Sequence, residues 1–333
     1  MAWLEFLGAA ALIVLTGTRL SRYGDQIAAR TGLGGALIGL VLLSTITSLP
    51  ELVVSTTSAV AIGSPDLAIG GLLGSNTFNL AIIVLLDILY RQGPLLSRVH
   101  PGHLLSAGLG VAFIGIVCAL ILFYEHGGHF EIAGVGLSSF VFVAVYILSA
   151  RLILLTERRR RRAAAGSQSE DRPTSSRLVY WKTGAAAAVI VAAGIWLAKS
   201  GEAIAVQTGW GESFVGNLLL AAATSLPEAV VSIGALRLGA VDMAISNLLG
   251  SNLFNIAIIA VCDVLYRKGS ILAEVSPTGI MAGLTAMAMT GVVIAALVVR
   301  EDRKTTLRIG SEAAALLLIY VVGNYFVFVM SRG

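Results

Sequence analysis

The chain has 333 residues, of which 56% are hydrophobic and only 13% are charged. An ordinary soluble domain has roughly 25% charged residues, and apolar runs near the roughly 20 residues that cross a bilayer recur along this chain. The composition excludes a soluble enzyme, a secreted disulfide scaffold and a disordered protein. The formal net charge of +4 does not indicate nucleic-acid binding, because the basic residues cluster beside the apolar runs.

The apolar runs predict an all-α membrane protein with ten transmembrane helices. They are too long and too continuous for the alternating strands of a membrane barrel. No basic segment precedes the first run, so the first helix is predicted to be retained and not cleaved as a signal peptide. The predicted spans are residues 3–20, 33–59, 67–90, 103–124, 130–153, 182–199, 213–236, 242–266, 277–299 and 309–330.

Basic residues predict the orientation of these helices, because they concentrate on the cytoplasmic side. With the amino terminus outside, 19 of the 23 Lys and Arg residues fall in cytoplasmic segments, and the opposite orientation inverts this ratio. The protein is therefore expected in the cell (inner) membrane, with both termini on its outer side. The polar stretch from Glu157 to Arg177 is expected to be a flexible cytoplasmic linker whose arginines set the topology, with anionic lipid binding as the alternative.

Two motifs occur twice at nearly the same offset, which indicates an internal duplication. TSLPE occupies residues 47–51 and 224–228, an offset of 177, and LLGSN-x-FN occupies residues 72–79 and 248–255, an offset of 176. Each copy holds five predicted helices, and because five is odd the second copy must enter the membrane from the opposite side. The sequence thus predicts two inverted-topology repeats, a plan common in secondary transporters. The predicted units are a first half, a basic linker and a second half, at residues 1–155, 156–178 and 179–333.

Glu51 and Glu228 end the two TSLPE motifs and lie inside apolar runs. A carboxylate at that depth costs at least ~2–3 kcal/mol even on a lenient insertion scale, so two of them in matching positions indicate function. Pro50 and Pro227 precede them. A proline disturbs the carbonyl four residues before it, and carbonyls freed at membrane depth are tolerated only where they line a cavity.

Neutral oxygen donors accompany each carboxylate at helical spacing, and no sulfur or imidazole joins them. Such an all-oxygen set favours hard cations such as Ca²⁺ or Na⁺ over zinc or copper. The candidate ligands are Glu51, Glu228, Thr47, Ser48, Thr224, Ser225, Ser75, Asn79, Ser251 and Asn255.

The duplicated pair of TSLPE and GSN-x-FN resembles the alpha-repeats of the cation/calcium exchanger superfamily, nearest its prokaryotic sodium/calcium exchangers. This resemblance covers nearly the whole chain. It implies an antiporter with a diamond of four ion sites, lined by helices two, three, seven and eight, across which the first and sixth helices slide. The implied ligands are the carboxylates of Glu51 and Glu228, the hydroxyls of Ser48 and Ser225, the carbonyls of Thr47 and Thr224, and the side chains of Ser75, Ser251, Asn79 and Asn255.

The chain departs from the pattern of that superfamily at two places. Many prokaryotic members, and the potassium-dependent ones, carry Asp at the position of Asn255, whereas Asn79 and Asn255 are both neutral here. This difference disfavours potassium co-transport. The residue before TSLPE is typically Gly, but Ile46 and Ala223 stand there, which bears on divalent selectivity.

We expect a secondary antiporter that exchanges sodium for calcium, electrogenically and without potassium. Proton/calcium exchange and exchange of another divalent cation such as Mg²⁺ or Mn²⁺ stay open as alternatives. A passive channel needs no inverted duplication, and an intramembrane enzyme would need a nucleophile–histidine pair or a DDxxD-like motif, which are missing. Besides Ca²⁺, Na⁺ and the lipid bilayer, no cofactor, nucleic acid or protein partner is expected.

Four aspartates are predicted to be structural. Asp87–Arg91 and Asp263–Arg267 have the spacing of salt bridges near helix ends. Asp66 and Asp242 are predicted to cap, or to complement the dipoles of, the helices that they begin.

The histidines and cysteines are predicted to have no role in the site. Cys118 and Cys262 lie in apolar runs and are expected in the core. The histidines fall in predicted loops or at their edges, which argues against a buried histidine site. They are His100, His103, His126 and His129.

Overall fold

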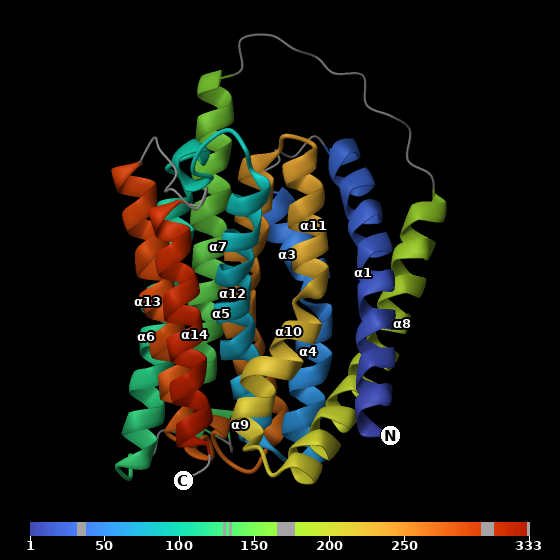
Figure 1. The fold of residues 1–333 in the computed structure, drawn as a ribbon, viewed down its shortest axis with the longest axis vertical. Coiled ribbons are helices and arrows are strands. Elements are labelled where there is room, and N and C mark those ends of the chain that lie inside the picture. Colours follow the sequence, from blue (N-terminus) through green and yellow to red (C-terminus); the bar gives the residue numbers. More distant parts are fainter. Residues whose placement is uncertain (32–37, 129–130, 133–134, 165–176, 301–309, 332–333) are drawn as a thin grey trace.

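Long apolar helices make up most of the computed structural model, which describes the chain except residues 32–37, 129–130, 133–134, 165–176, 301–309 and 332–333 (Figure 1). The elements before the linker are α1 (Ala2–Thr31), η1 (Ile38–Leu43), α3 (Ser44–Thr47), α4 (Leu49–Thr56), η2 (Thr57–Ile62), α5 (Pro65–Leu89), η3 (Leu96–Arg98), α6 (His103–Glu125), β1 (Glu131–Ile132), β2 (Val135–Gly136) and α7 (Leu137–Ala164). Those after it are α8 (Arg177–Thr208), α9 (Glu212–Val215), η4 (Gly216–Leu220), α10 (Ala221–Thr224), α11 (Leu226–Arg237), α12 (Val241–Tyr266), η5 (Ile271–Ala273), α13 (Thr278–Val299) and α14 (Ser311–Met330).

Eight of the ten predicted spans match candidate membrane crossings in the described residues. Seven helices are long and apolar enough to cross, and the pair Glu212–Thr224 and Leu226–Arg237, bent by 41°, makes an eighth. The predicted spans 33–59 and 130–153 contain the shorter apolar helices Leu49–Ile62 and Ser139–Leu152. The first of these is short because the helix is interrupted at Ser48.

Two connecting segments differ from the predictions. β1 and β2 pair as antiparallel strands, with Glu131 opposite Gly136, so a minimal ladder stands where the sequence predicted the start of the helix 130–153. Residues 157–164, predicted to be flexible linker, continue α7 as helix, in keeping with the high helix propensity of their Arg and Ala residues. The remaining linker residues 165–176 lie outside the described residues.

The helices are arranged around α5 and α12, the most buried of the candidate spans (Figure 1). The helices α1 and α8 pack on each other along one side of the bundle, and α6, α13 and α14 lie on the other side. The start of α1 and the end of α14 lie at one end of the bundle, whereas α7 ends and α8 begins at the opposite end, which we call the linker end (Figure 1). The two halves exchange contacts, because η4 packs on α5 and η1 packs on α12.

Glycines let η1 and η4, which are π-helical, approach the central helices α5 and α12 at backbone distance. A Cβ atom at Gly74 of α5 would lie 2.3 Å from the carbonyl oxygen of Asn217, and one at Gly250 of α12 would lie 2.5 Å from that of Leu40. Small residues serve this purpose in membrane helix pairs, where close backbone packing stabilises the contact. The central four segments therefore form one tightly packed unit.

Asp87 and Asp263 are buried and bind backbone across the two halves. The carboxylate of Asp263 accepts hydrogen bonds from the N–H groups of Gly136 (2.9 Å) and Ile271 (2.6 Å) and from the Ser139 hydroxyl. Asp87 accepts from the N–H groups of Leu95 and Gly310, both at 2.8 Å. Buried N–H groups need acceptors, and the carboxylates supply them.

The predicted Asp263–Arg267 salt bridge is wrong, since among the described residues Asp263 forms no ion pair. Arg267 instead follows the end of α12 with a positive φ of 55° and is exposed.

Asp66 and Asp242 lie in the first turns of α5 and α12, where a carboxylate complements the helix dipole, but neither caps its helix. Both also bind segments of the other half. Ser64 caps α5 by accepting a hydrogen bond from the N–H of Leu67. Asp66 accepts one from the N–H of Ser276 at 2.8 Å.

Asp242 accepts hydrogen bonds from the N–H of His100 at 2.8 Å and pairs with Nε2 of His103 at 3.0 Å. His103 is buried and lies at the edge of a loop, as predicted, and its partner Asp242 is not one of the candidate ion ligands. Its place at the first residue of α6, beside α12, accounts for the burial. Cys118 and Cys262 are buried free thiols, as predicted.

We predict that Gly74→Ala destabilises the protein by about 1–3 kcal/mol, because the new methyl group overlaps the Asn217 backbone. The matched control is Gly108→Ala in α6, where a Cβ meets nothing within 4 Å. Thermal unfolding in detergent should show a lower midpoint for the first variant and an equal or higher one for the control. Equal midpoints for both variants would contradict the packing described here.

Candidate cation-binding site

Each TSLPE motif contains a break in its helix. Ser48 separates α3 from α4 with φ −87° and ψ 11°, and Ser225 separates α10 from α11 with φ −87° and ψ 3°. Pro50 and Pro227 lie in the first turn of the following helix, where a missing N–H group is tolerated. The proline thus ends one helix and begins the next, as the sequence predicted.

The breaks leave backbone carbonyls without helical partners. Across the first break, the N–H of Ser48 bonds to Ser44 and the N–H of Leu52 bonds to Ser48. Across the second, Ser225 bonds to Ala221 and Ala229 bonds to Ser225 in the same way.

None of the hydrogen bonds across these breaks in the described residues uses the carbonyl oxygen of Thr47 or of Thr224. Both threonines are buried, and neither carbonyl is used by the backbone bonds that cross the breaks.

The two buried glutamates are held by serines of the opposite half. Ser48 donates to Oε1 of Glu228 at 3.0 Å, and Ser225 donates to Oε1 of Glu51 at 3.1 Å. Only 2% of Glu51 and 0% of Glu228 is exposed, so both carboxylates lie fully inside the protein. The structure brings together two acids that are 177 positions apart in the sequence.

The serines of the central helices differ in their contacts. Ser251 on α12 donates to Oε1 of Glu228 at 3.3 Å, which adds a second hydroxyl to that carboxylate. Ser75 on α5 instead lies 3.3 Å from the hydroxyl oxygen of Thr224. The site is thus nearly symmetric in composition but not in its hydrogen bonds.

Four asparagines link α5 to α12 beside the carboxylates. The amide nitrogen of Asn79 donates to Oδ1 of Asn252, and that of Asn255 donates to Oδ1 of Asn76, both at 3.0 Å. Asn76 and Asn252 were not among the predicted site residues. Their presence in both copies of the GSN motif was the signal that could have identified them.

The predicted ligands present oxygens without hydrogen-bond partners. Within the described residues these are Oε2 of Glu51, Oε2 of Glu228, Oδ1 of Asn79 and Oδ1 of Asn255, all buried. Leaving buried polar atoms unpaired is costly, and all four of these atoms are acceptors. An oxygen-preferring cation satisfies such a set, whereas another acceptor does not.

The donor chemistry narrows the class of ion. No cluster of three or more His, Cys, Asp or Glu side chains occurs in the described part of the chain. The set therefore contains two carboxylates and several neutral oxygens, which suits Ca²⁺ or Na⁺ and not a metal that recruits nitrogen or sulfur.

Ile46 and Ala223, which precede the two TSLPE motifs, pack against the outer helices α1 and α8. Ile46 lies against Ala186 and Ile190 of α8. Ala223 lies in an apolar cluster formed largely by α1 and α8. These positions therefore shape the contact with the outer helix pair.

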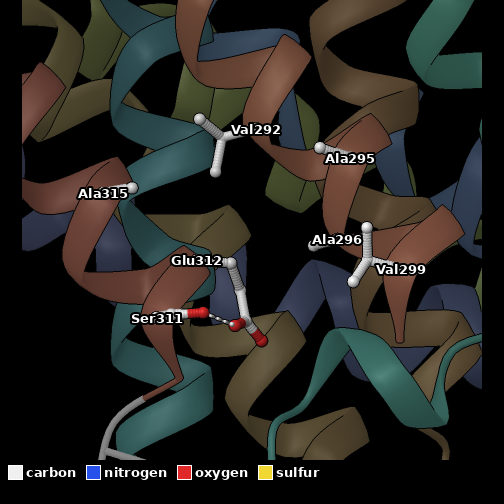
Figure 2. Close-up of a pocket in the computed structure, with 7 residues that line it drawn as sticks. All are labelled: Val292, Ala295, Ala296, Val299, Ser311, Glu312 and Ala315. Carbon is white, nitrogen blue, oxygen red and sulfur yellow. Dashed lines mark hydrogen bonds between the residues drawn. The ribbon is translucent and has the colours of Figure 1, made fainter. Parts of the chain in front are cut away.

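A separate cavity of about 340 Å³ lies between α13 and α14 (Figure 2). Its walls are mostly valine and alanine side chains, and Glu312 and Ser311 are the polar residues on it (Figure 2). A single carboxylate with one hydroxyl offers too few oxygens for a cation site of the kind described above. The lining residues are Val292, Ala295, Ala296, Val299, Ser311, Glu312 and Ala315.

Comparison with known proteins finds relatives over the whole chain. The model of the family described as sodium/calcium exchanger protein matches residues 1–155 and 179–329. The putative antiporter CaxA of Alkalimonas amylolytica is 26% identical over 337 residues, covering 95% of both chains. The inner membrane protein YrbG of Escherichia coli K12 is 26% identical over 346 residues, covering 95% of this chain and 94% of its own.

Solved structures share the fold. The H⁺/Ca²⁺ exchanger CAX superimposes with a TM-score of 0.70 at 16% identity, over 99% of this chain and 85% of its own. The sodium–calcium exchanger NCX_Mj gives a TM-score of 0.62 at 17% identity, over 96% of this chain and 97% of its own. The family model covers both motif copies and confirms the resemblance drawn from them, so the chain belongs to the sodium/calcium exchanger family of membrane transporters.

Proposed function

We propose that this protein is a secondary active antiporter that exchanges Na⁺ for Ca²⁺ by alternating access. The observation that carries the proposal is the pair of buried glutamates, each with an unpartnered Oε2 atom, set among neutral oxygens. Two negative charges balance one Ca²⁺ or two Na⁺, so the same site can bind either the calcium ion or sodium ions. Ion exchange at one shared site is the basis of antiport.

In this proposal Glu51 and Glu228 are the acidic ligands of the ion. Hydroxyl, carbonyl and amide oxygens complete its coordination. These neutral ligands are Ser48, Ser225, Ser75, Ser251, the carbonyls of Thr47 and Thr224, and Oδ1 of Asn79 and Asn255.

Sodium is favoured over protons as the coupling ion by the neutral oxygens. A proton resides on one carboxylate oxygen and leaves the amide oxygens of Asn79 and Asn255 unsatisfied. A sodium ion is coordinated by several oxygen atoms, so it would also bind these amide oxygens. Proton/calcium exchange is the rival, because the fold is shared by exchangers named for either ion.

Neutral side chains at positions 79 and 255 support exchange without potassium. Both asparagines donate their amide N–H groups to asparagines of the facing helix, which an aspartate cannot do. The side-chain amide groups of Asn79 and Asn255 thus help to hold α5 against α12. The ligand set therefore lacks the third carboxylate that an aspartate at position 255, as in the potassium-dependent members of the superfamily, would supply.

We propose ten membrane crossings as two inverted repeats, with the termini outside and the linker in the cytoplasm. The motif offsets, the reciprocal serine–glutamate bonds and the location of the start of α1 and the end of α14 at one end of the bundle support this topology (Figure 1). The outer pair α1 and α8 would slide across the central unit. This pair meets the helices of the two TSLPE motifs at glycines: a Cβ at Gly17 of α1 would lie 2.9 Å from Pro227, and one at Gly194 of α8 would lie 3.0 Å from Val53.

Replacing Glu51 or Glu228 by Gln should abolish calcium exchange in proteoliposomes, because either change removes half of the charge that balances Ca²⁺. The matched control is Glu274→Gln, on an exposed glutamate. Thermal unfolding in the absence of calcium checks that each variant is folded. Calcium exchange at the wild-type rate by folded Glu51→Gln would refute the proposed site.

A sodium gradient alone should drive calcium uptake into proteoliposomes, and neither a proton nor a potassium gradient should replace it. The neutral oxygens are the reason, since they give sodium its ligands. Ser48→Ala or Ser225→Ala should weaken this sodium coupling and keep some calcium binding. Uptake driven by protons alone would establish the rival function, and a strict need for K⁺ would require another acid in the site.

Exchange should be electrogenic. The resemblance implies that more sodium charge than calcium charge moves per cycle, and a net charge crossing the membrane couples to voltage by ~2.3 kcal/mol per 100 mV. Calcium flux measured in vesicles clamped at several potentials should rise in one direction and fall in the other. A flux independent of voltage would indicate an electroneutral cycle, such as two protons per calcium.

A further inference from the structure

A cavity of about 500 Å³ lies between α1 and α11 at the linker end of the bundle. Thr18 and Arg22 of α1 line one side, and the last two turns of α11 line the other. The α11 wall includes Val230, Ile233 and Arg237, and Leu238 follows it with 77% of its surface exposed. The cavity therefore joins an apolar wall to two guanidinium groups.

The cavity carries positive charge. Among the residues whose side chains the structure describes, its lining contains Arg22 and Arg237 and no acidic side chain. Neither arginine forms an ion pair within the described residues. Asp242, in the neighbouring first turn of α12, has its Oδ1 engaged by His100 and His103. A cavity of this charge repels Ca²⁺ and Na⁺, so its chemistry is opposite to that of the carboxylate site.

An amphipathic anion fits this combination. Guanidinium groups bind phosphate through paired, charge-assisted hydrogen bonds. Basic pockets between membrane helices bind anionic lipid head groups, and a hydrocarbon chain covers apolar wall that a soluble anion leaves bare. The cavity is lined by the last turns of α11, at the level at which a head group lies if the linker end faces the cytoplasm.

We propose that this cavity binds one anionic phospholipid. Its phosphate bridges Arg22 and Arg237, and its acyl chain lies along Val230, Ile233 and Leu238. The site is distinct from the linker arginines, because it is built from α1 and α11.

The bound lipid would connect an outer helix to a helix of the ion site. Arg237 ends the helix that begins beside Glu228, and Arg22 lies on α1, which also contacts Pro227 through Gly17. If α1 slides during exchange, a lipid that bridges these helices changes the exchange rate. This consequence rests on the proposed function, whereas the binding itself does not.

Lipid binding is tested by native mass spectrometry of the purified full chain titrated with phosphatidylglycerol or phosphatidylcholine. The wild type should retain phosphatidylglycerol in preference, and Arg22→Gln with Arg237→Gln should weaken its affinity by at least about tenfold. Arg91→Gln is the matched control, an exposed arginine just after the end of α5 and outside the cavity. Equal affinity for both lipids, or an unchanged affinity in the double variant, would overturn the proposal.

A second arm separates a lipid from a soluble anion. Inorganic phosphate and glycerol 3-phosphate at millimolar concentration should not displace the lipid. Displacement by either would make the ligand a soluble phosphate and overturn the lipid assignment.

The rate consequence is measured as calcium exchange in phosphatidylcholine vesicles with and without phosphatidylglycerol. Phosphatidylglycerol should change the rate of the wild type and of Arg91→Gln but not that of the double variant. A wild type that exchanges no calcium refutes the proposed function and leaves the binding result intact. An equal lipid response in all three proteins would refute the bridging role.

Discussion

Two hydrogen bonds between the halves of the chain determine the site. Ser48 donates to Glu228 and Ser225 donates to Glu51. The orientation of each carboxylate therefore depends on a serine of the other half. A carboxylate placed deep in an apolar bundle is stable only with such donors and, when charged, with a cation beside it. The serines reach across because the helix is interrupted at their own positions. The same interruption frees the threonine carbonyls.

Much of this arrangement could be predicted from the sequence, for a physical reason. A charged residue inside an apolar run is rare, and its repetition at a fixed offset marked Glu51 and Glu228 without a structure. The helix breaks followed from Pro50 and Pro227. Of the four linking asparagines, only Asn79 and Asn255 were predicted as site residues. The spacing that joins Ser75 to Asn79 along one helix does not reveal which residue of another helix bonds to Asn76.

The aspartates show why the remaining contacts could not be predicted. An arginine four residues after Asp263 suggested a local salt bridge, but the carboxylate is buried and binds the N–H groups of Gly136 and Ile271. Which distant N–H groups lack acceptors depends on the tertiary arrangement, and local spacing does not reveal it. His103 is a similar case, because its burial follows from the approach of α12 to the start of α6. Residues 157–164 are polar in composition, yet nothing in their propensities opposes helix.

The exchanged aspartate contacts have a consequence for how this protein can evolve. After a gene duplication, two copies usually accumulate substitutions independently. Here Asp263 of the second half holds Gly136 of the first, and Asp87 of the first holds Gly310 of the second. Replacing either aspartate would therefore leave a backbone N–H group of the other copy without its acceptor. Each copy thus constrains which residue the other can carry at these positions, although the two lie on a single chain.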